Sequence, residues 1–347
     1  VLGAVDSLEN AGIPCFGPRA NAAIIEGSKI FSKNLMKKYN IPTAEYEVFD
    51  NAENAIKYLS DCKYPAVLKA DGLALGKGVI IAQTKEEAVD AIHSMMEDRV
   101  FGDSGTKVVV EEFLTGPEVS VLSFTDGNTV VPMVSSMDHK RAHDNDEGPN
   151  TGGMGTVAPN PYYTKEIAEE CMEKIFLPTI KAMNAEGRTF KGCLYFGLML
   201  TENGPKVIEY NCRFGDPETQ VVLPLLESDL LTVMQAVTNG TLAETEVKFG
   251  NGSACCVILA SKGYPVKYES GYEIVLPKTD ENEVIYVAGA KKDGEKLLSA
   301  GGRVLGVTAT APTLEEAVKK AYELTDRVKF DNGFCRKDIG RRALMRK

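Results

Sequence analysis

Residues Pro205 to Gln220, P-K-V-I-E-Y-N-C-R-F-G-D-P-E-T-Q, form the stretch on which the interpretation of the whole chain depends. The apolar residues at positions 207, 208 and 210 predict a buried strand. Glu209 and Asn211 lie two residues apart on that strand, so their side chains leave the same face. A carboxylate and an amide oxygen on one face form an oxygen-rich site suited to Mg²⁺. Arg213 follows two residues later. Any one of these three residues alone is also typical of a surface ion pair.

The composition is that of a soluble globular protein. The chain has 347 residues, 44% of them apolar and 25% charged, which predicts two or three domains. Its net charge of −10 argues against a nucleic acid or a membrane surface as partner, and no apolar run is long enough to span a membrane. Eight cysteines without a C-x-x-C pair and three histidines argue against a zinc site and favour free thiols in a reducing cytoplasm.

The order of predicted elements indicates a multidomain α/β (α+β) fold. Residues 20–39 are predicted to be helical, with a break at 27–28 and Ser28 as the helix cap. A hairpin, a helix and a strand between residues 64 and 114 suggest a small lid. Paired strands are expected at 194–200 and 206–210, and a separate C-terminal domain from about residue 251.

A glycine-rich loop lies between two lysines, Lys69 and Lys77, with glycines at 72, 76 and 78. Glycines let backbone N–H groups approach phosphate oxygens, and the lysines supply counter-charge. The loop is neither a Walker A motif, since it is one residue short and lacks the Ser/Thr, nor a G-x-G-x-x-G motif. Taken alone, it also fits an ordinary hairpin with solvated lysines.

The strand end Glu111-Glu112-Phe113-Leu114 leads to Glu118 through Gly116-Pro117. Its two carboxylates fit either a solvated edge or a hinge between lid and body. In the second interpretation, backbone groups of the hinge meet an adenine edge and Glu118 meets ribose hydroxyls.

Residues Asp138 to Gly155 are too polar and glycine-rich for a connector of that length without a function. Lys140 and Arg141 suit an anionic ligand, and the glycines at 152–155 suit a close approach of the backbone to it. His139 is a weak candidate base, and a solvated loop histidine is the favoured interpretation.

The sequence contains no Ser/His/Asp or Cys/His arrangement for covalent catalysis. Its lysines, glycines and acid–amide pair indicate phosphoryl transfer instead, in which positioning, metal and cationic clamps stabilise the transition state. The acceptor is predicted to be the group that Arg213 holds, and a carboxylate suits a guanidinium.

Six motifs carry a resemblance to a known family: E-G-S-K at 26–29, K-A-D-G-L-A-L-G-K-G-V at 69–79, D-H-K-R at 138–141, G-P-N-T-G-G-M-G at 148–155, N-C-R-F-G-D-P-E-T-Q at 211–220 and F-C-R-K-D-I-G at 334–340. In this order they resemble the phosphoribosylamine–glycine ligase (glycinamide ribonucleotide synthetase) family of ATP-grasp enzymes of purine biosynthesis. The resemblance extends over nearly the whole chain.

The resemblance implies a reaction and a role for each motif. The γ-phosphoryl group of ATP would pass to the glycine carboxylate, and 5-phosphoribosylamine would attack the resulting glycyl phosphate, with Mg²⁺ or Mn²⁺ bridging the phosphates. The ATP-binding residues would be Lys29, Lys69, Gly76, Lys77, Glu111, Glu112, Phe113, Leu114 and Glu118. The substrates would be bound by Asp138, His139, Lys140, Arg141, Gly152, Gly153, Gly155 and Arg213, with Arg213 and Asp216 catalytic and Glu209 and Asn211 as metal ligands.

The resemblance also implies a division into domains: an N-terminal biotin-carboxylase-like remnant at 1–18, a central ATP-grasp domain at 19–45 and 117–250, a lid subdomain at 46–116 and a C-terminal domain at 251–347. Only the last helix and a strand at 13–17 would represent the N-terminal domain, so upstream sequence is expected. Residues 194–200 lack the extra acid common in ATP-grasp enzymes, so a second metal would be held by phosphates and Glu209 alone.

Three functional hypotheses stay open at this point: a glycine-specific ATP-dependent ligase, another carboxylate–amine ligase or carboxylase subunit with the same ATP chemistry, and a non-catalytic nucleotide-binding module. Glycine-dependent release of ADP separates the first from the second. The metal pair and the lysines favour an enzyme over the third.

Overall fold

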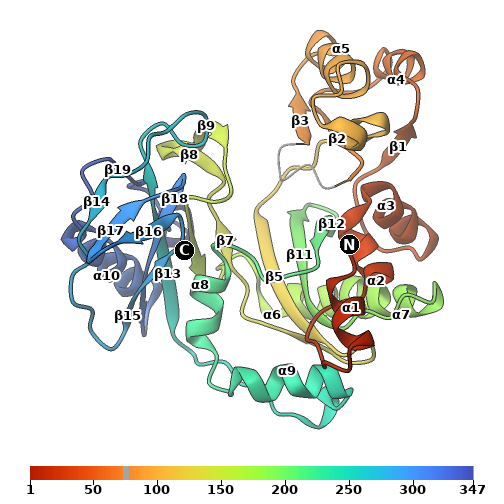
Figure 1. Ribbon diagram of the computed structural model, residues 1–347. Helices are drawn as coiled ribbons and strands as arrows, with labels where there is room; N and C mark the ends of the chain where they lie inside the picture. The colour runs from red at the N-terminus through yellow and green to blue at the C-terminus, as the bar shows by residue number, and fades with distance from the viewer. Residues whose placement is uncertain (73–77, 347) are drawn as a thin grey trace.

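The computed structural model of the protein describes residues 1–72 and 78–346 (Figure 1). The N-terminal part is helical, with α1 (Ala4–Asn10), α2 (Ala20–Gly27) and α3 (Lys29–Lys38). The predicted cap is confirmed, because Ser28 Oγ accepts the Phe31 N–H at 3.1 Å. The predicted strand at 13–17 is wrong, since that segment is irregular and pairs with no described strand.

The first sheet has the strand order β1-β4-β2-β3 and, with α4 and α5, forms the upper right part of Figure 1. We call residues 46–112 the β1–β4 unit. Apolar residues from both helices and from the sheet form its core, among them Leu59, Leu68 and Ile92. The elements are β1 (Tyr46–Phe49), α4 (Ala52–Leu59), β2 (Ala66–Ala70), β3 (Val79–Ala82), α5 (Lys85–Ile92), a π-helical turn (His93–Glu97), a 3-10 turn (Gly102–Thr106) and β4 (Val108–Glu112).

The second sheet, β12-β11-β5-β6, lies in the centre of the molecule. Helices α2, α3 and α6–α7 cover one face, where Phe176 and Phe196 pack with ring centroids 4.4 Å apart. A π-helical turn (Met172–Phe176) lies between α6 and α7. The elements are β5 (Glu118–Thr125), β6 (Val130–Pro132), α6 (Lys165–Cys171), α7 (Leu177–Ala185), β11 (Gly192–Thr201), β12 (Gly204–Asn211), α8 (Thr219–Val222), a 3-10 turn (Leu223–Leu225), α9 (Leu230–Asn239) and a 3-10 turn (Leu242–Glu244).

The third sheet has the order β15-β18-β13-β10-β7, with β19 beside β13. Its strands β7 and β10 come from residues 137–158, so the sheet extends across the predicted boundary at 251, and the division into domains stays a prediction. A small sheet, β14-β17-β16, accompanies it. The elements are β7 (Met137–Asp138), β10 (Gly155–Ala158), β13 (Ser253–Ser261), β14 (Glu273–Ile274), β15 (Glu283–Val287), β16 (Ala290–Asp293), β17 (Lys296–Ser299), β18 (Arg303–Ala311), α10 (Leu314–Arg327), β19 (Gly333–Phe334) and α11 (Arg341–Leu344).

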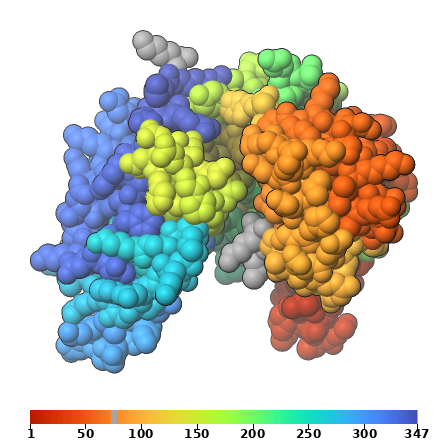
Figure 2. Space-filling model, turned by 90° about the horizontal axis from the view of Figure 1, so that it is seen from above, coloured from red at the N-terminus to blue at the C-terminus, as the bar shows by residue number. Residues whose placement is uncertain are grey.

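The predicted polar loop between residues 138 and 155 contains a hairpin of β8 (Arg141–His143) and β9 (Glu147–Asn150), joined by a 3-10 turn (Asp144–Asp146). Figure 2 shows this hairpin in yellow-green, facing the orange β1–β4 unit across a groove. The hairpin therefore lies on the opposite side of the groove from the β1–β4 unit, whose strand β2 contains Lys69. Among the described residues, no helix has the length and apolar character needed to cross a lipid bilayer.

Candidate active site

A β-bulge decides where the last side chains of β12 point. The pairing of β12 with β11 leaves Ile208 as an extra residue. Val207 and Tyr210 are both buried although they are three residues apart, because the bulge reverses the alternation. The side chains of Glu209 and Asn211 therefore point to the face of the sheet opposite to Val207 and Tyr210, where Glu209 is exposed and Asn211 is half-buried.

The β1–β4 unit contacts β12 at this bulge. Lys69 of β2 donates from Nζ to the Ile208 carbonyl oxygen at 3.1 Å. Lys29 of α3 donates to the carbonyl oxygen of residue 72 at 2.9 Å, and burial together with Lys69 lowers its pKa. The other predicted phosphate ligands of this loop, Gly76 and Lys77, lie outside the described residues.

Lys69 belongs to a buried cluster of ion pairs. Oε2 of Glu111 lies 3.1 Å from Nζ of Lys33 and 3.0 Å from Nζ of Lys69, and all three side chains are buried. Burial lowers the pKa of Lys33 to about 8, although Glu111 acts in the opposite direction. The side chain of Glu111 is thus a buried counter-ion and not a lining group of an adenine pocket. Lys33 was not predicted, because nothing in K-I-F-S-K-N-L-M-K-K distinguishes it from solvated lysines.

The remaining residues of the predicted adenine segment connect β4 to β5. Glu112 pairs with Lys206 of β12 at 2.7 Å, and its carboxylate also accepts the Glu45 N–H at 3.1 Å. Phe113 is 38% exposed and Leu114 is half-buried. This segment therefore lies where the β1–β4 unit meets the central sheet.

Glu118 and Lys140 form an ion pair of 2.9 Å between β5 and the segment that precedes the hairpin. Partial burial lowers the pKa of Lys140, but Glu118, Tyr195 and Glu209 outweigh it, so that this pKa is raised overall. The same pairing holds the pKa of Glu118 below its usual range. Glu118, the predicted ribose ligand, is thus in direct contact with Lys140, a predicted ligand of an anionic substrate.

Two acids, Asp138 and Glu218, lie close enough for their charges to interact. Burial raises the pKa of both carboxyl groups, and the charge of Glu218 raises that of Asp138 further. Ser120 Oγ donates to Glu218 Oε1 at 3.3 Å and lies 2.8 Å from the Tyr195 hydroxyl. Glu218 was not predicted, although it belongs to the motif at 211–220.

The favoured interpretation of His139 as a solvated loop residue is wrong. Its side chain is buried, with Nδ1 3.1 Å from the Gly155 carbonyl oxygen, and Nε2 accepts the Gly340 N–H at 3.2 Å. Burial and the charge of Arg336 lower the pKa of His139 to about 4. Because both ring nitrogens bind the backbone, His139 supports the segment and has no nitrogen left for a substrate. Gly155 is itself buried in β10.

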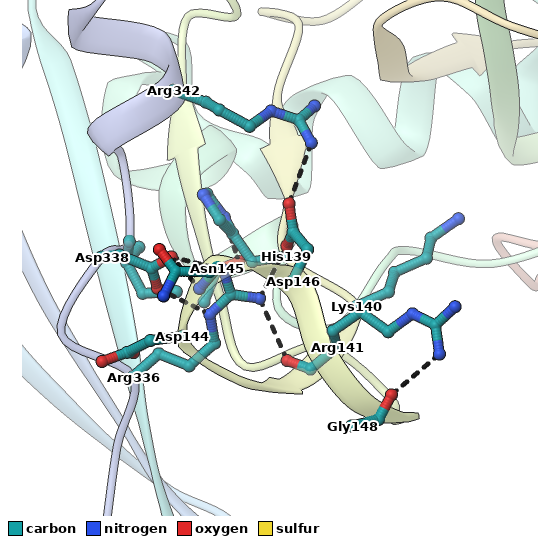
Figure 3. Close-up of polar contacts among 12 residues, drawn as sticks. His139, Lys140, Arg141, Asp144, Asn145, Asp146, Gly148, Arg336, Asp338 and Arg342 are labelled. Carbon is teal, nitrogen blue, oxygen red and sulfur yellow. Dashed lines mark hydrogen bonds and ion pairs between the residues drawn. The ribbon is translucent and has the colours of Figure 1, made fainter.

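Arg336 attaches the hairpin to the C-terminal segment (Figure 3). Its buried guanidinium binds both carboxylate oxygens of Asp338 at 2.8 and 2.9 Å, Asp146 at 2.9 Å and the Arg141 carbonyl oxygen at 3.1 Å. Arg141 in turn donates to the Gly148 carbonyl oxygen at 2.8 Å. The motif F-C-R-K-D-I-G therefore holds the β8–β9 hairpin in place.

The backbone N–H groups of the predicted glycine loop are already bound within the protein. Gly152 donates to the Tyr264 hydroxyl at 3.1 Å, and Gly153 donates to Thr151 Oγ1 at 3.0 Å. The predicted close approach of a ligand to this backbone therefore does not use these two donors.

The two predicted catalytic side chains differ in their surroundings. Arg213 is exposed and donates to the Phe214 carbonyl oxygen at 3.1 Å and to Asn211 Oδ1 at 3.4 Å. The carboxylate of Asp216 is paired with Arg303 of β18 at 2.8 Å. Arg303 was not predicted, because 87 residues separate it from Asp216.

The donor set at the end of β12 fits a hard divalent cation. Glu209 lies near enough to Lys29 to oppose the lowering of its pKa, and near enough to Lys140 to contribute to the raised pKa of that lysine. Within residues 1–72 and 78–346, no group of three or more His, Cys, Asp or Glu side chains could hold a metal ion. One carboxylate and one amide oxygen, Glu209 and Asn211, suit Mg²⁺ or Mn²⁺ when phosphate oxygens and water complete the shell.

Comparisons with known proteins identify the family of the chain. Residues 27–219 match the family model of the ATP-grasp (A) domain of phosphoribosylglycinamide synthetase, and residues 254–342 match that of its C domain. A phosphoribosylamine–glycine ligase of Clostridium acetobutylicum is 48% identical over 341 residues, which are 98% of this chain and 82% of that relative. One of Escherichia coli O157:H7 is 46% identical over 350 residues, 100% of this chain and 82% of the relative.

Solved structures give the same result. The crystal structure of phosphoribosylamine–glycine ligase from Thermotoga maritima has a TM-score of 0.87 at 38% identity and covers 93% of this chain and 81% of that one. A biotin carboxylase complex from Campylobacter jejuni, with a TM-score of 0.76 at 17% identity over 95% of this chain and 72% of that one, shares the fold alone. The predicted ATP-grasp fold and the resemblance are confirmed. The chain belongs to the phosphoribosylglycinamide synthetase, or phosphoribosylamine–glycine ligase, family.

Proposed function

We propose that the protein ligates glycine to 5-phosphoribosylamine with cleavage of ATP to ADP and phosphate, as a cytoplasmic enzyme of purine biosynthesis that yields glycinamide ribonucleotide. The names of its relatives support the two substrates. The observation that carries most weight is the contact of Lys69 with the Ile208 carbonyl oxygen. It sets a predicted phosphate-binding lysine against the strand end that carries Glu209 and Asn211.

The nucleotide would lie between the β1–β4 unit, acting as a lid, and the central sheet. Lys29 and Lys69 would bind its phosphates, the segment 112–114 its adenine, and Glu118 its ribose. Glu209 and Asn211 would hold Mg²⁺ or Mn²⁺, which when bound neutralises charge on the phosphates. The buried Glu111 supports this assignment, because it fixes the position of Lys69.

The acceptor would be the glycine carboxylate, held by the exposed guanidinium of Arg213. One carboxylate oxygen bonds to the γ-phosphorus as the bond to the β–γ bridging oxygen breaks, giving glycyl phosphate and ADP. The amine of phosphoribosylamine then attacks the acyl carbon, the C–O bond to phosphate breaks, and the amine proton passes to the departing phosphate. Lys140 and Arg141 would bind the anionic groups of these substrates, and the raised pKa of Lys140 keeps it charged at neutral pH.

Release of ADP tests this proposal. The full protein is incubated with ATP and Mg²⁺, and glycine and phosphoribosylamine are added separately and together. Stoichiometric ADP and glycinamide ribonucleotide are expected only with both. Turnover with bicarbonate, or with another amino acid in place of glycine, would identify a carboxylase subunit or a different carboxylate–amine ligase instead.

A further inference from the structure

Arg303, the first residue of β18, joins two segments that are far apart in the sequence. Its guanidinium donates to the carbonyl oxygens of Gly152 at 2.8 Å, Gly153 at 3.4 Å and Asp216 at 3.1 Å. It also forms an ion pair with both carboxylate oxygens of Asp216, at 2.8 and 3.3 Å. A single side chain therefore connects the glycine segment after the β8–β9 hairpin with the turn that follows Arg213.

The glycine segment cannot be held in this place by side chains of its own. A Cβ atom on Gly153 would lie 2.5 Å from Cδ of Pro217 and 2.7 Å from Oδ1 of Asp138, and its φ of +108° also favours glycine. Gly153 therefore lies directly against the Asp216-Pro217 turn, whereas a Cβ atom on Gly152 would lie 3.0 Å from Cζ of Arg303. Their position relative to that turn has to be set by groups from elsewhere in the fold.

Hydrogen bonds provide a restraint on the β18 side. A cavity of about 200 Å³ borders Asp216, Tyr264 and Arg303. Arg303 donates to the carbonyl oxygen of Gly152, and the hydroxyl oxygen of Tyr264 accepts the Gly152 N–H at 3.1 Å. The side chain of Arg303 is only 20% exposed, and a charged donor in such surroundings forms strong hydrogen bonds.

We propose that Arg303 is a positioning residue for the amino-acid substrate: it fixes the distance between the Gly152–Gly153 segment and the Asp216 turn, and thereby places Arg213 opposite the hairpin. Arg303 itself need not touch the substrate. This inference rests on the proposed function, because these segments bind glycine only if the protein is the proposed ligase.

Two measurements test the inference on the full protein, with the variants Arg303→Gln and Arg303→Lys. Amide hydrogen exchange of residues 148–155 is expected to be about tenfold faster in Arg303→Gln, since a charge-assisted restraint of the Gly152 carbonyl is lost. The KM for glycine should rise about tenfold, while the KM for ATP stays within about twofold. Arg303→Lys, which keeps the charge but loses the fork of donors, should recover part of both effects.

Arg327→Gln is the matched control. Arg327 of α10 also pairs with an acid of this part of the fold, Glu283, and donates to the Lys278 carbonyl oxygen at 3.3 Å. This variant should change neither the exchange of residues 148–155 nor the KM for glycine.

Unchanged exchange and an unchanged glycine KM in Arg303→Gln would overturn the inference, as would equal increases in the KM for glycine and for ATP. Exchange needs no turnover, so it also separates this inference from the proposed function. If the unsubstituted protein does not turn over glycine, the function is wrong, while the exchange data still decide whether Arg303 restrains the segment. If Arg303→Gln does not fold, Arg303→Lys should still show faster exchange and a higher KM for glycine than the unsubstituted protein, and unchanged values would overturn the inference.

Discussion

Lys69 of β2 donates a hydrogen bond of 3.1 Å to the carbonyl oxygen of Ile208, the extra residue of the bulge in β12. A bulged residue is left out of the regular pairing of the sheet, so its carbonyl group is available to another element. The bond ties the β1–β4 unit to the strand end that carries Glu209. The proposed nucleotide site therefore depends on an irregularity of the sheet as much as on the charged side chains.

Replacing Glu209 by alanine should abolish turnover and leave the fold intact. Glu209 is exposed, so its loss removes no buried contact, but it removes the only carboxylate of the proposed metal pair. A loss of several kcal/mol of charge stabilisation corresponds to a rate lower by roughly 10³-fold. ADP release and thermal unfolding are measured together. Glu202→Ala, at an exposed turn of the same hairpin, is the control, and an active Glu209→Ala enzyme would rule out the metal assignment.

Replacing Glu111 by glutamine should destabilise the protein by about 3–5 kcal/mol, because Lys33 and Lys69 are then buried without a counter-ion. Urea unfolding measures this change. The neighbouring Glu112→Gln variant is the matched control: Glu112 is 40% exposed and its pair with Lys206 is worth at most about 1 kcal/mol. Equal effects of the two substitutions would contradict the buried-cluster account.

The buried His139 predicts a loss of stability in mild acid. Burial and Arg336 lower the pKa of His139 to about 4 in the folded protein, below its ordinary value of 6.5. Between these values the unfolded chain binds more protons, so stability falls as the pH falls. The contribution between pH 7 and pH 5 is about 2 kcal/mol.

Urea unfolding at both pH values, for the unsubstituted protein and for His139→Gln, isolates this contribution from that of the carboxylates. The variant should lose less stability on acidification, by about the same 2 kcal/mol. Identical pH dependence in the two proteins would mean that His139 does not stay neutral in the fold.

Replacing Gly153 by alanine should cost about 2–4 kcal/mol and raise the KM for glycine, because the new Cβ meets Pro217 and Asp138 at a φ of +108°. Gly187→Ala separates the cost of the close contacts from the cost of the positive φ. Gly187 has a φ of +69° but no atom within 4 Å of the added Cβ, so only the backbone cost of about 1 kcal/mol is expected. If both variants behave alike, close packing at Gly153 is not what requires glycine.

Features that depend on residues close together in the sequence were predictable. The cap at Ser28 and the hairpin of β11 and β12 follow from local patterns, and both are confirmed. The bulge at Ile208 was not predictable, because V-I-E-Y-N is equally compatible with a regular strand and only the register against β11 reveals the extra residue.

Features that depend on distant partners escaped prediction. His139 stands in a polar stretch that is typical of a solvated loop, but its Nε2 is bound by Gly340, 201 residues away. Arg303 is one of many arginines, and only the return of β18 to the Asp216 turn gives it a role. Local pattern could therefore indicate the chemistry of the site, whereas the residues that support it became visible only with the tertiary structure.

Transfer of oxygen from glycine to phosphate tests the central claim most directly. Glycine labelled with ¹⁸O in its carboxylate is supplied with ATP, Mg²⁺ and phosphoribosylamine, and the released phosphate is analysed by mass spectrometry. If glycyl phosphate forms, each phosphate released carries one labelled oxygen. Phosphate without label, at a measured turnover to glycinamide ribonucleotide, would contradict activation of the carboxylate by phosphoryl transfer.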